Sequence, residues 1–184
     1  MNSRQSSLTT KDLVYIALAA VLICVCSWIS IPMAVPFTLQ TFAVFCALEL
    51  LGGKRGTLAV CVYILLGAVG LPVFSGFTGG IGKLLGTTGG YIIGFAVSSL
   101  IFWAFEALCS KSRAVRIASL ILGLAACYAF GTAWFMYVYA KGTGPIALGT
   151  ALSWCVIPFI LPDLLKLALA HLICARISKL VKIG

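Results

Sequence analysis

The stretch AVRIASLILGLAACYAFGTAWFMYVY, Ala114 to Tyr139, contains a single charged residue, Arg116, and is otherwise almost wholly apolar or small. About 20 such residues in a helix cross the hydrocarbon core of a bilayer, which is about 30 Å thick. Within that core each backbone N–H and C=O needs a partner, and a helix supplies one inside the segment itself. The stretch therefore predicts a transmembrane helix.

Five further apolar runs accompany this stretch, and glycines or prolines separate them: residues 13–29, 37–51, 56–69, 91–108 and 145–174. Hydrophobic residues make up 62% of the 184 residues and charged residues only 9%, whereas soluble domains carry about 25% charged residues. We expect an all-α integral membrane protein with six transmembrane helices. Residues 1–184 would form a single transmembrane substrate-binding domain, with no room for a soluble one.

The distribution of Lys and Arg predicts the orientation of the helices, because these residues gather on the cytoplasmic side. With the N-terminus inside, only Lys83 and Lys141 lie outside, and Lys166 falls within the sixth run. The other ten cations lie inside: Arg4, Lys11, Lys54, Arg55, Lys111, Arg113, Arg116, Arg176, Lys179 and Lys182. Both termini are therefore predicted to be cytoplasmic. Topology accounts for the net charge of +9, and no basic helix or aromatic platform predicts nucleic-acid binding.

Several functional classes are disfavoured by the pattern of reactive residues. The eight cysteines lie in or at the ends of apolar runs without a CxxC pair, so we expect packing residues and no metal site. His171 lies near the inner end of the sixth run, and no Ser–His–acid constellation accompanies it. A membrane enzyme or a resident cofactor is therefore not expected.

Two opposite charges within the sixth run are not explained by topology. Asp12, Glu49 and Glu106 lie near the ends of runs, but Asp163 lies 13 residues before Arg176, about 20 Å along a helix. Lys166 is three residues further on and shares a face with Asp163. Ionised groups at that depth usually face a cavity or the bundle interior. They predict a polar ligand site, or alternatively an internal ion pair between helices.

The prolines of the sixth run predict an interruption of the helix close to this pair. Proline suits the first turn of a helix and disrupts its interior. Pro158 and Pro162 therefore predict a kink or break immediately before Asp163. Broken helices at membrane depth occur where backbone groups line a cavity.

The stretch from Pro72 to Gly90 holds many glycines and predicts a long loop on the outer side. It fails as a Walker A motif, because Phe77 and Leu84 stand where Gly and Ser or Thr are needed. The chain is therefore not expected to bind ATP in that way. Glycine permits close approach of the backbone to a ligand, so we interpret the loop as an outer lid, with a plain flexible loop as the alternative.

Five phrases in order resemble the BioY family, the biotin-specific S components of energy-coupling factor (ECF) transporters. They are VPFTLQT (35–41), ELLG (49–52), LGAVGLPVF (66–74), GTTGGY (86–91) and PFILPDLLK (158–166). The resemblance implies an S-component-like bundle in the prokaryotic cell membrane that captures biotin from outside. It also implies partners, namely a transmembrane coupling protein and two ABC-type ATPases. The ligand could instead be another vitamin, or the chain could be an autonomous biotin facilitator.

Biotin would suit the proposed site, since its ureido N–H groups suit a carboxylate and its carboxylate suits a cation. We expect the ligand to contact polar, charged and aromatic residues of three regions: Thr38, Gln40, Phe74, Phe77, Thr78, Gly79, Gly80, Lys83, Tyr91, Trp154, Asp163 and Lys166. Small residues permit close helix approach. Ala17, Ala20 and Cys24 therefore form a candidate stripe for docking on the coupling protein, or alternatively for packing within the chain.

Overall fold

The computed structural model describes residues 8–109 and 112–180, which are almost entirely helical. Helices α1, α2, α4, α5 and α7 are long, α3 and α6 are short, and β1 and β2 form a two-residue hairpin ladder. The elements are α1 (Thr10–Trp28), β1 (Ser30–Ile31), β2 (Phe37–Thr38), α2 (Gln40–Ala68), α3 (Ile81–Leu85), α4 (Gly89–Leu108), α5 (Arg113–Gly142), α6 (Leu148–Cys155) and α7 (Ile157–Leu180).

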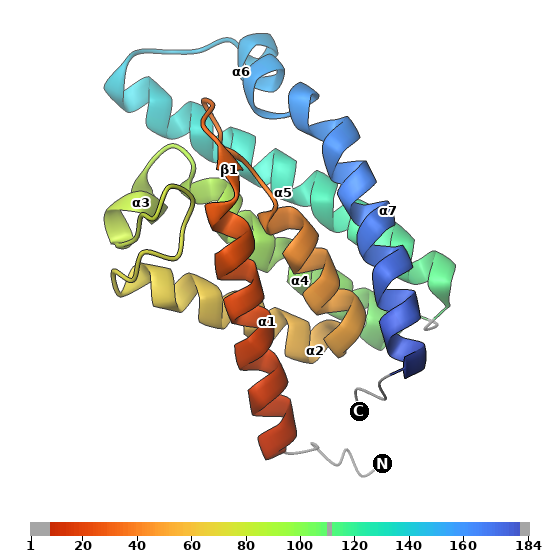
Figure 1. The fold of residues 1–184 in the computed structure, drawn as a ribbon. Helices are drawn as coiled ribbons and strands as arrows, with labels where there is room; N and C mark the ends of the chain where they lie inside the picture. Colours follow the sequence, from red (N-terminus) through yellow and green to blue (C-terminus); the bar gives the residue numbers. More distant parts are fainter. Residues whose placement is uncertain (1–7, 110–111, 181–184) are drawn as a thin grey trace.

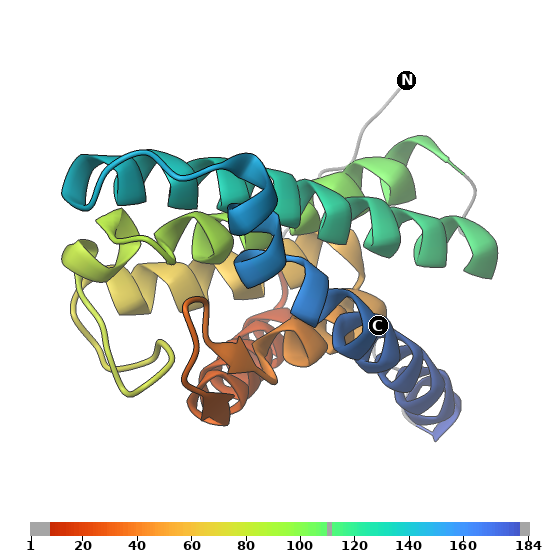
Figure 2. The ribbon, with the colours of Figure 1, turned by 90° about the horizontal axis from the view of Figure 1, so that it is seen from above.

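Helix α2 lies at the centre of the bundle, where it packs against α1, α4 and α7. Helix α5 lies along α4 on the far side, and α6 continues from α5 into α7 (Figures 1 and 2). The start of α1 and the end of α7 lie at the same end of the bundle (Figure 1), which we call the terminal end. This arrangement agrees with a chain whose two termini share one side of the membrane.

Within the described residues, five helical stretches are long and apolar enough to cross a membrane: Thr10–Trp28, Gln40–Ala68, Gly89–Leu108, Arg113–Gly142 and Leu148–Lys179. The second of these is bent at Gly52, so it contains the two runs that the sequence separates at that point. The structure therefore holds a helical segment for each of the six predicted runs. The count of six crossings and the orientation in the membrane stay predictions.

The bend in α2 depends on the backbone conformation of Gly52, with φ 77° and ψ 173°. This region is open essentially to glycine alone. The freed N–H of Gly53 donates to the Glu106 carboxylate of α4, 2.5 Å away. Beyond the bend Gly56 lies so close to Leu48 that a Cβ there would be 2.9 Å from its methyl group. Glu106, which lies near Lys111 in the sequence, thus fixes the bend between the two parts of α2 on either side of Gly52.

We expect Gly52→Ala to lower the free energy of unfolding by about 1–3 kcal/mol, the cost of a strained backbone conformation. The new Cβ would also lie 3.3 Å from the Glu106 carboxylate oxygens. Thermal unfolding in detergent measures the effect. Gly82→Ala is the matched control, because φ there is not positive and a Cβ would meet nothing within 4 Å. Equal stabilities for the two variants would contradict the role of Gly52.

The prediction of a break immediately before Asp163 is wrong in its position. The helix is interrupted at Val156, between α6 and α7, where φ is −127° and ψ −57°. Pro158 lies in the first turn of α7, where its missing N–H costs no hydrogen bond. Pro162 lies inside α7, and the helix continues through it to Asp163. The loss of one backbone hydrogen bond at Pro162 is thus accommodated without ending the helix.

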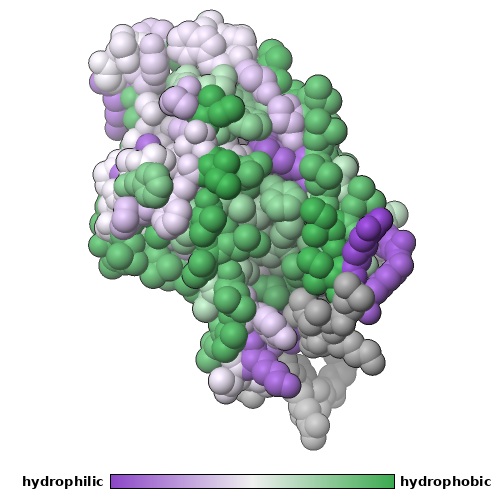
Figure 3. All heavy atoms as spheres, in the orientation of Figure 1, coloured by the Kyte–Doolittle hydropathy of each residue, from purple (hydrophilic) through white to green (hydrophobic). Residues whose placement is uncertain are grey.

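Large apolar side chains cover much of the outer surface of the helices (Figure 3). On α7 they form one face, which includes Leu161, Leu165 and Leu172, at 68%, 57% and 62% exposure. The opposite face is buried and places Phe159, Asp163, Lys166, Ala170 and Cys174 toward the bundle. Exposed apolar surface of this extent is unfavourable in water and suits contact with lipid.

The glycine-rich loop is anchored to the ends of α1 and α2. The Ser27 hydroxyl donates to the carbonyl of Val73, and Trp28 Nε1 donates to the carbonyl of Pro72, 2.8 Å away. Gly67 leaves space for the ring of Phe74, which a Cβ would overlap. These contacts hold residues 72–75 against the helices, and from there the loop passes through α3 to the start of α4. Opening of the loop as a lid stays a prediction.

Candidate functional site

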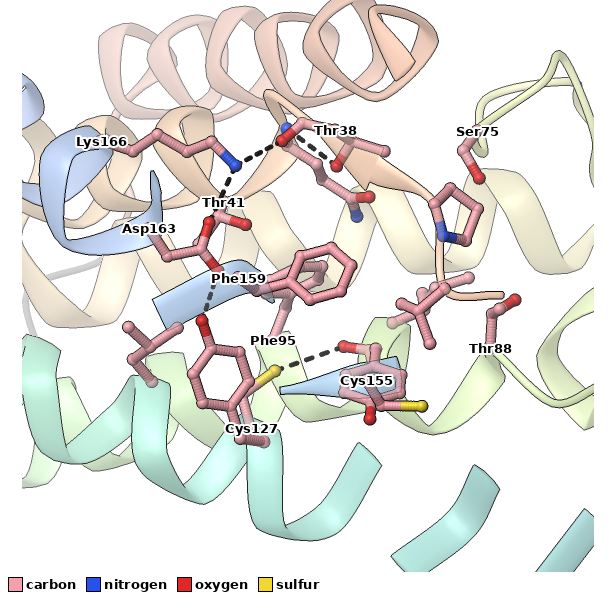
Figure 4. Close-up of a pocket in the computed structure, with 17 residues that line it drawn as sticks. Thr38, Thr41, Ser75, Thr88, Phe95, Cys127, Cys155, Phe159, Asp163 and Lys166 are labelled. Carbon is pink, nitrogen blue, oxygen red and sulfur yellow. Dashed lines mark hydrogen bonds and ion pairs between the residues drawn. The ribbon is translucent and has the colours of Figure 1, made fainter. Parts of the chain in front are cut away.

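A pocket lies between α2, α4, α5 and α7 and is partly open to solvent. Figure 4 shows Asp163, Lys166 and Thr38 at one side of it and Ser75 and Thr88 at the other. Its walls combine apolar, aromatic and polar side chains from segments far apart in the chain: Val35, Pro36, Thr38, Gln40, Thr41, Ser75, Thr88, Tyr91, Ile92, Phe95, Leu124, Cys127, Tyr128, Cys155, Phe159, Asp163 and Lys166.

The predicted pair of opposite charges is formed and buried. Lys166 Nζ lies 2.8 Å from Asp163 Oδ1, and the two side chains are 7% and 4% exposed. Their spacing of three residues on α7 brings both to the buried face of the helix. Burial of two charges is favourable only when further hydrogen bonds satisfy their remaining atoms. The neighbouring elements supply these bonds.

Each member of the pair has a second partner from another element. Tyr128 of α5 donates its hydroxyl to Asp163 Oδ2 at 2.6 Å. Lys166 Nζ donates to the backbone carbonyl of Thr38 at 2.7 Å and lies 4.0 Å from the ring centre of Phe37. The pair thus joins α7, α5 and the hairpin strand β2. Hydrogen bonds from fixed donors preorganise the carboxylate in one orientation.

A buried donor without a protein partner opens onto the same pocket. The residue Gln40 is 5% exposed, and its side-chain Nε2 has no hydrogen-bond partner among the described residues. Its backbone N–H donates to the Thr38 hydroxyl at 3.2 Å, which fixes the start of α2 beside the ion pair. Buried polar groups are nearly always paired. An unpaired amide in a pocket is therefore expected where a bound molecule supplies the acceptor.

The remaining walls are mostly apolar and aromatic, apart from the hydroxyl groups of Thr41, Ser75 and Thr88. Tyr91 presents its ring, because its hydroxyl is bonded to Thr132 Oγ1 2.9 Å away. Phe95 and Phe159 lie between the ion pair and the side of the pocket that holds Ser75 and Thr88 (Figure 4). Such a pocket suits a ligand with a polar end and an apolar body.

Five residues predicted from the sequence to contact a ligand come together in this pocket: Thr38, Gln40, Tyr91, Asp163 and Lys166. The lysine contacts Thr38 through the backbone carbonyl rather than through the hydroxyl. Seven others lie outside the lining: Phe74, Phe77, Thr78, Gly79, Gly80, Lys83 and Trp154.

The surroundings of these seven explain their positions. Phe74 is fully buried against Tyr63, with ring centres 5.5 Å apart, and Phe77 stacks on Trp28 at 5.1 Å. Trp154 is 42% exposed and lies edge-on to a tyrosine of α5. The other four belong to the loop and α3, where the N–H of Gly80 donates to the carbonyl of Gly67 at 2.7 Å, and that of Lys83 to the carbonyl of Gly80 at 3.1 Å. Their contact with a ligand stays a prediction.

Sequence reasoning missed several lining residues, of which Tyr128 has the most direct contact with the ion pair. A tyrosine hydroxyl in the middle of an apolar run needs a partner when it is buried. That rule could have linked Tyr128 with Asp163, since few acceptors are available at such depth. Thr41, Phe95 and Phe159 carry no comparable signal, because each fits an ordinary packed helix face.

The predicted docking stripe on α1 divides between two faces of the helix. Ala20 and Cys24 are 1% and 6% exposed and belong to the core, where α1 packs against α2. Ala17 is exposed. The positions of the first two agree with the alternative of packing within the chain, and docking through Ala17 stays a prediction. Among residues 8–109 and 112–180, no group of three potential metal ligands occurs.

The fold and the pocket define a class: a multi-pass membrane protein, with a pocket of mixed polar and apolar lining between its helices. Comparisons with known proteins specify the family. The BioY family model matches residues 1–183. The biotin transporter BioY of Thermotoga maritima is 42% identical over 171 residues, 92% of this chain and 97% of that protein. The probable biotin transporter BioY of Pyrococcus horikoshii is 38% identical over 169 residues, 91% and 96% of the two chains.

A solved structure is also similar, that of the S-component for biotin from an ECF-type ABC transporter. It has a TM-score of 0.79 and 28% sequence identity, and the match covers 97% of this chain and 95% of that chain. The chain belongs to the BioY family. The resemblance noted from the five sequence phrases is thereby confirmed, as is the helical membrane fold.

Proposed function

We propose that this protein binds biotin in the pocket beside Asp163 and Lys166 and acts as the S component of an ECF-type transporter. The observation that carries the proposal is the buried ion pair. Its two members, Asp163 and Lys166, line a pocket that is also lined by Gln40, whose side-chain amide nitrogen is unpaired among the described residues. The family membership and the names of the relatives support biotin as the ligand. ATPases on partner subunits would drive delivery, with no resident cofactor.

The ureido ring of biotin matches the donors and acceptors at the ion pair. A carboxylate has about four acceptor positions, and Asp163 uses one on each oxygen for Lys166 and Tyr128. It can therefore still accept from a ureido N–H. The ureido oxygen can accept from Gln40 Nε2 or from the third ammonium proton of Lys166. The sulfur-containing ring and the alkyl chain would then lie along Phe95, Phe159 and Tyr91.

An S component for another vitamin is the first alternative. Isothermal titration of the purified protein with biotin, riboflavin and thiamine distinguishes these ligands. We expect heat of binding with biotin and none with the other two. Binding of riboflavin or thiamine in the absence of a biotin signal would refute the assignment of the ligand.

An autonomous facilitator is the second alternative, because partners are not part of the structure. Proteoliposomes that contain only this chain should take up no labelled biotin, whereas reconstitution with a coupling protein and its ATPases should give ATP-dependent uptake. Sustained uptake by the chain alone would favour the facilitator and would leave the binding pocket unaffected.

We expect Tyr128→Phe to weaken biotin binding by about tenfold, since one hydrogen bond to a charged group contributes about 1.5 kcal/mol. The variant removes only the hydroxyl that donates to Asp163 Oδ2 and keeps the ring in place. Tyr137→Phe is the matched control, because Tyr137 is exposed on α5 and lies outside the pocket. Equal affinities of both variants would show that Tyr128 does not orient the carboxylate for the ligand.

A further inference from the structure

A second cavity lies at the terminal end of the bundle, remote from the ligand pocket along α7. It is formed by the part of α2 that precedes the bend at Gly52, the start of α5 and the last turns of α7. Its lining is rich in charged and polar side chains: Glu49, Arg113, Arg116, His171, Cys174, Ala175, Ser178 and Lys179. None of these residues lines the pocket proposed for biotin.

The single carboxylate in the lining is already engaged. Glu49 Oε2 lies 3.4 Å from Arg116 Nη2, and Oε1 lies 3.4 Å from His171 Nδ1. Arg116 also donates to the backbone carbonyl of Glu49. The negative charge of Glu49 is therefore matched by Arg116 alone, with His171 as an additional hydrogen-bonding partner. Within the described residues, the Nε group of Arg116 is buried without an acceptor.

Two further cations in the lining lack a partner. The contacts within residues 8–109 and 112–180 include no ion pair or hydrogen bond for the side chains of Arg113 and Lys179. Both side chains are exposed and belong to different helices. The cavity thus carries an excess of two positive charges. Positive charges brought together without a counterion favour the binding of an anion.

The start of α5 increases this preference for an anion. Arg113 is the first residue of the helix, and the N–H groups of its first turn carry the positive end of the helix dipole. The N–H of Val115 is bonded to the Ser112 hydroxyl at 3.3 Å, whereas residues 113 and 114 precede the first intrahelical donors. Phosphate is an anion that arginine, lysine and helix N-termini commonly bind in proteins.

We propose that this cavity binds a phosphate group, supplied by an anionic lipid headgroup or by free phosphate. Arg113, Arg116 and Lys179 hold the charge, and His171 and Ser178 border it. The cavity lies at the end of apolar helices, where phosphate groups of a bilayer are expected, and basic pockets between transmembrane helices bind anionic headgroups. This site depends on the charges at the terminal end and not on the identity of the transported ligand.

Native mass spectrometry of the purified protein tests the site with phosphatidylglycerol and, as the neutral reference, phosphatidylcholine. We expect wild-type protein to retain phosphatidylglycerol preferentially. Arg113→Gln/Lys179→Gln should weaken this retention by about fivefold for each side chain removed, the contribution of one basic residue at an anionic surface. The matched control is Lys11→Gln/Lys54→Gln, which removes the same charge from exposed positions outside the cavity.

A second arm identifies the source of the phosphate. Thermal unfolding is measured with inorganic phosphate and with chloride at equal ionic strength. Stabilisation by inorganic phosphate without preferential retention of phosphatidylglycerol would assign the site to soluble phosphate. Should the double variant not fold, Arg113→Gln and Lys179→Gln are tested singly, each with an expected fivefold loss. Retention that is unchanged in these variants, or reduced equally in the control, would overturn the proposal.

Discussion

Replacing Asp163 by asparagine is expected to weaken biotin binding by at least about tenfold, which corresponds to about 1.5 kcal/mol for a charged hydrogen bond. The Asp163 carboxylate accepts from both Lys166, at 2.8 Å, and Tyr128, at 2.6 Å. An amide has one acceptor oxygen, so one of these two donors would face an NH₂ group. No acceptor would then remain in the right place for a ureido N–H, and Lys166 would become a buried cation without a counterion.

Isothermal titration of the Asp163→Asn variant with biotin measures this loss. Asp12→Asn is the matched control, since Asp12 also forms an ion pair, with Arg55 at 2.9 Å, but lies at the start of α1 outside the pocket. We expect the control to bind biotin with wild-type affinity. Wild-type affinity in a folded Asp163→Asn variant would instead assign Asp163 a purely structural role.

Replacing Lys166 by methionine should have an effect of similar or greater size, because it leaves the Asp163 carboxylate buried with Tyr128 as its remaining donor. Removing one partner of a buried ion pair costs about 3–5 kcal/mol of stability. We therefore expect a large fall in the thermal unfolding temperature together with loss of measurable biotin binding. Methionine approximates the length of lysine, so the change tests the charge more than the packing.

The double variant Asp163→Asn/Lys166→Met separates the ligand site from an internal ion pair that only joins helices. Removing both charges of a buried pair leaves no charge without its counterion, and replacement of such pairs by well-packed hydrophobic residues is often neutral for stability or stabilising. The double variant should therefore be more stable than Lys166→Met and still fail to bind biotin. Recovery of both stability and biotin affinity would show that the pair serves packing alone.

The helical fold was predictable because apolar runs and their interruptions act locally. Each run between residues 13 and 174 corresponds to a helical segment. A capping box also fixes the start of α1, with Thr9 Oγ1 accepting from the N–H of Asp12 and the Asp12 carboxylate accepting from the N–H of Thr9. The break of the sixth run was placed incorrectly, because proline in the first turn of a helix and proline inside it look alike in a sequence. The non-helical backbone at Val156 shows that the break precedes Pro158, which therefore lies in the first turn of α7, whereas Pro162 lies inside the helix.

The charged centre of the pocket was predictable and its surroundings were not. Asp163 and Lys166 stand out, since charges are rare in apolar runs, and their spacing places them on one helix face. Their partners arise from tertiary contacts: the carbonyl of Thr38 is 128 residues distant from Lys166 in sequence, and Tyr128 is 35 residues from Asp163. Such pairings depend on how α5 and the hairpin pack against α7, which residue types alone do not determine.

We expect biotin to occupy the pocket in contact with Asp163 and Lys166, and an experimental structure of the protein with biotin bound would establish the position of the ligand. In that structure the ureido ring should lie within hydrogen-bonding distance of the Asp163 carboxylate, with the alkyl chain directed past Phe95 and Phe159 toward Ser75 and Thr88. Biotin bound elsewhere on the protein, with the Asp163–Lys166 pair unchanged and its pocket without ligand, would show that this pocket is not the biotin site.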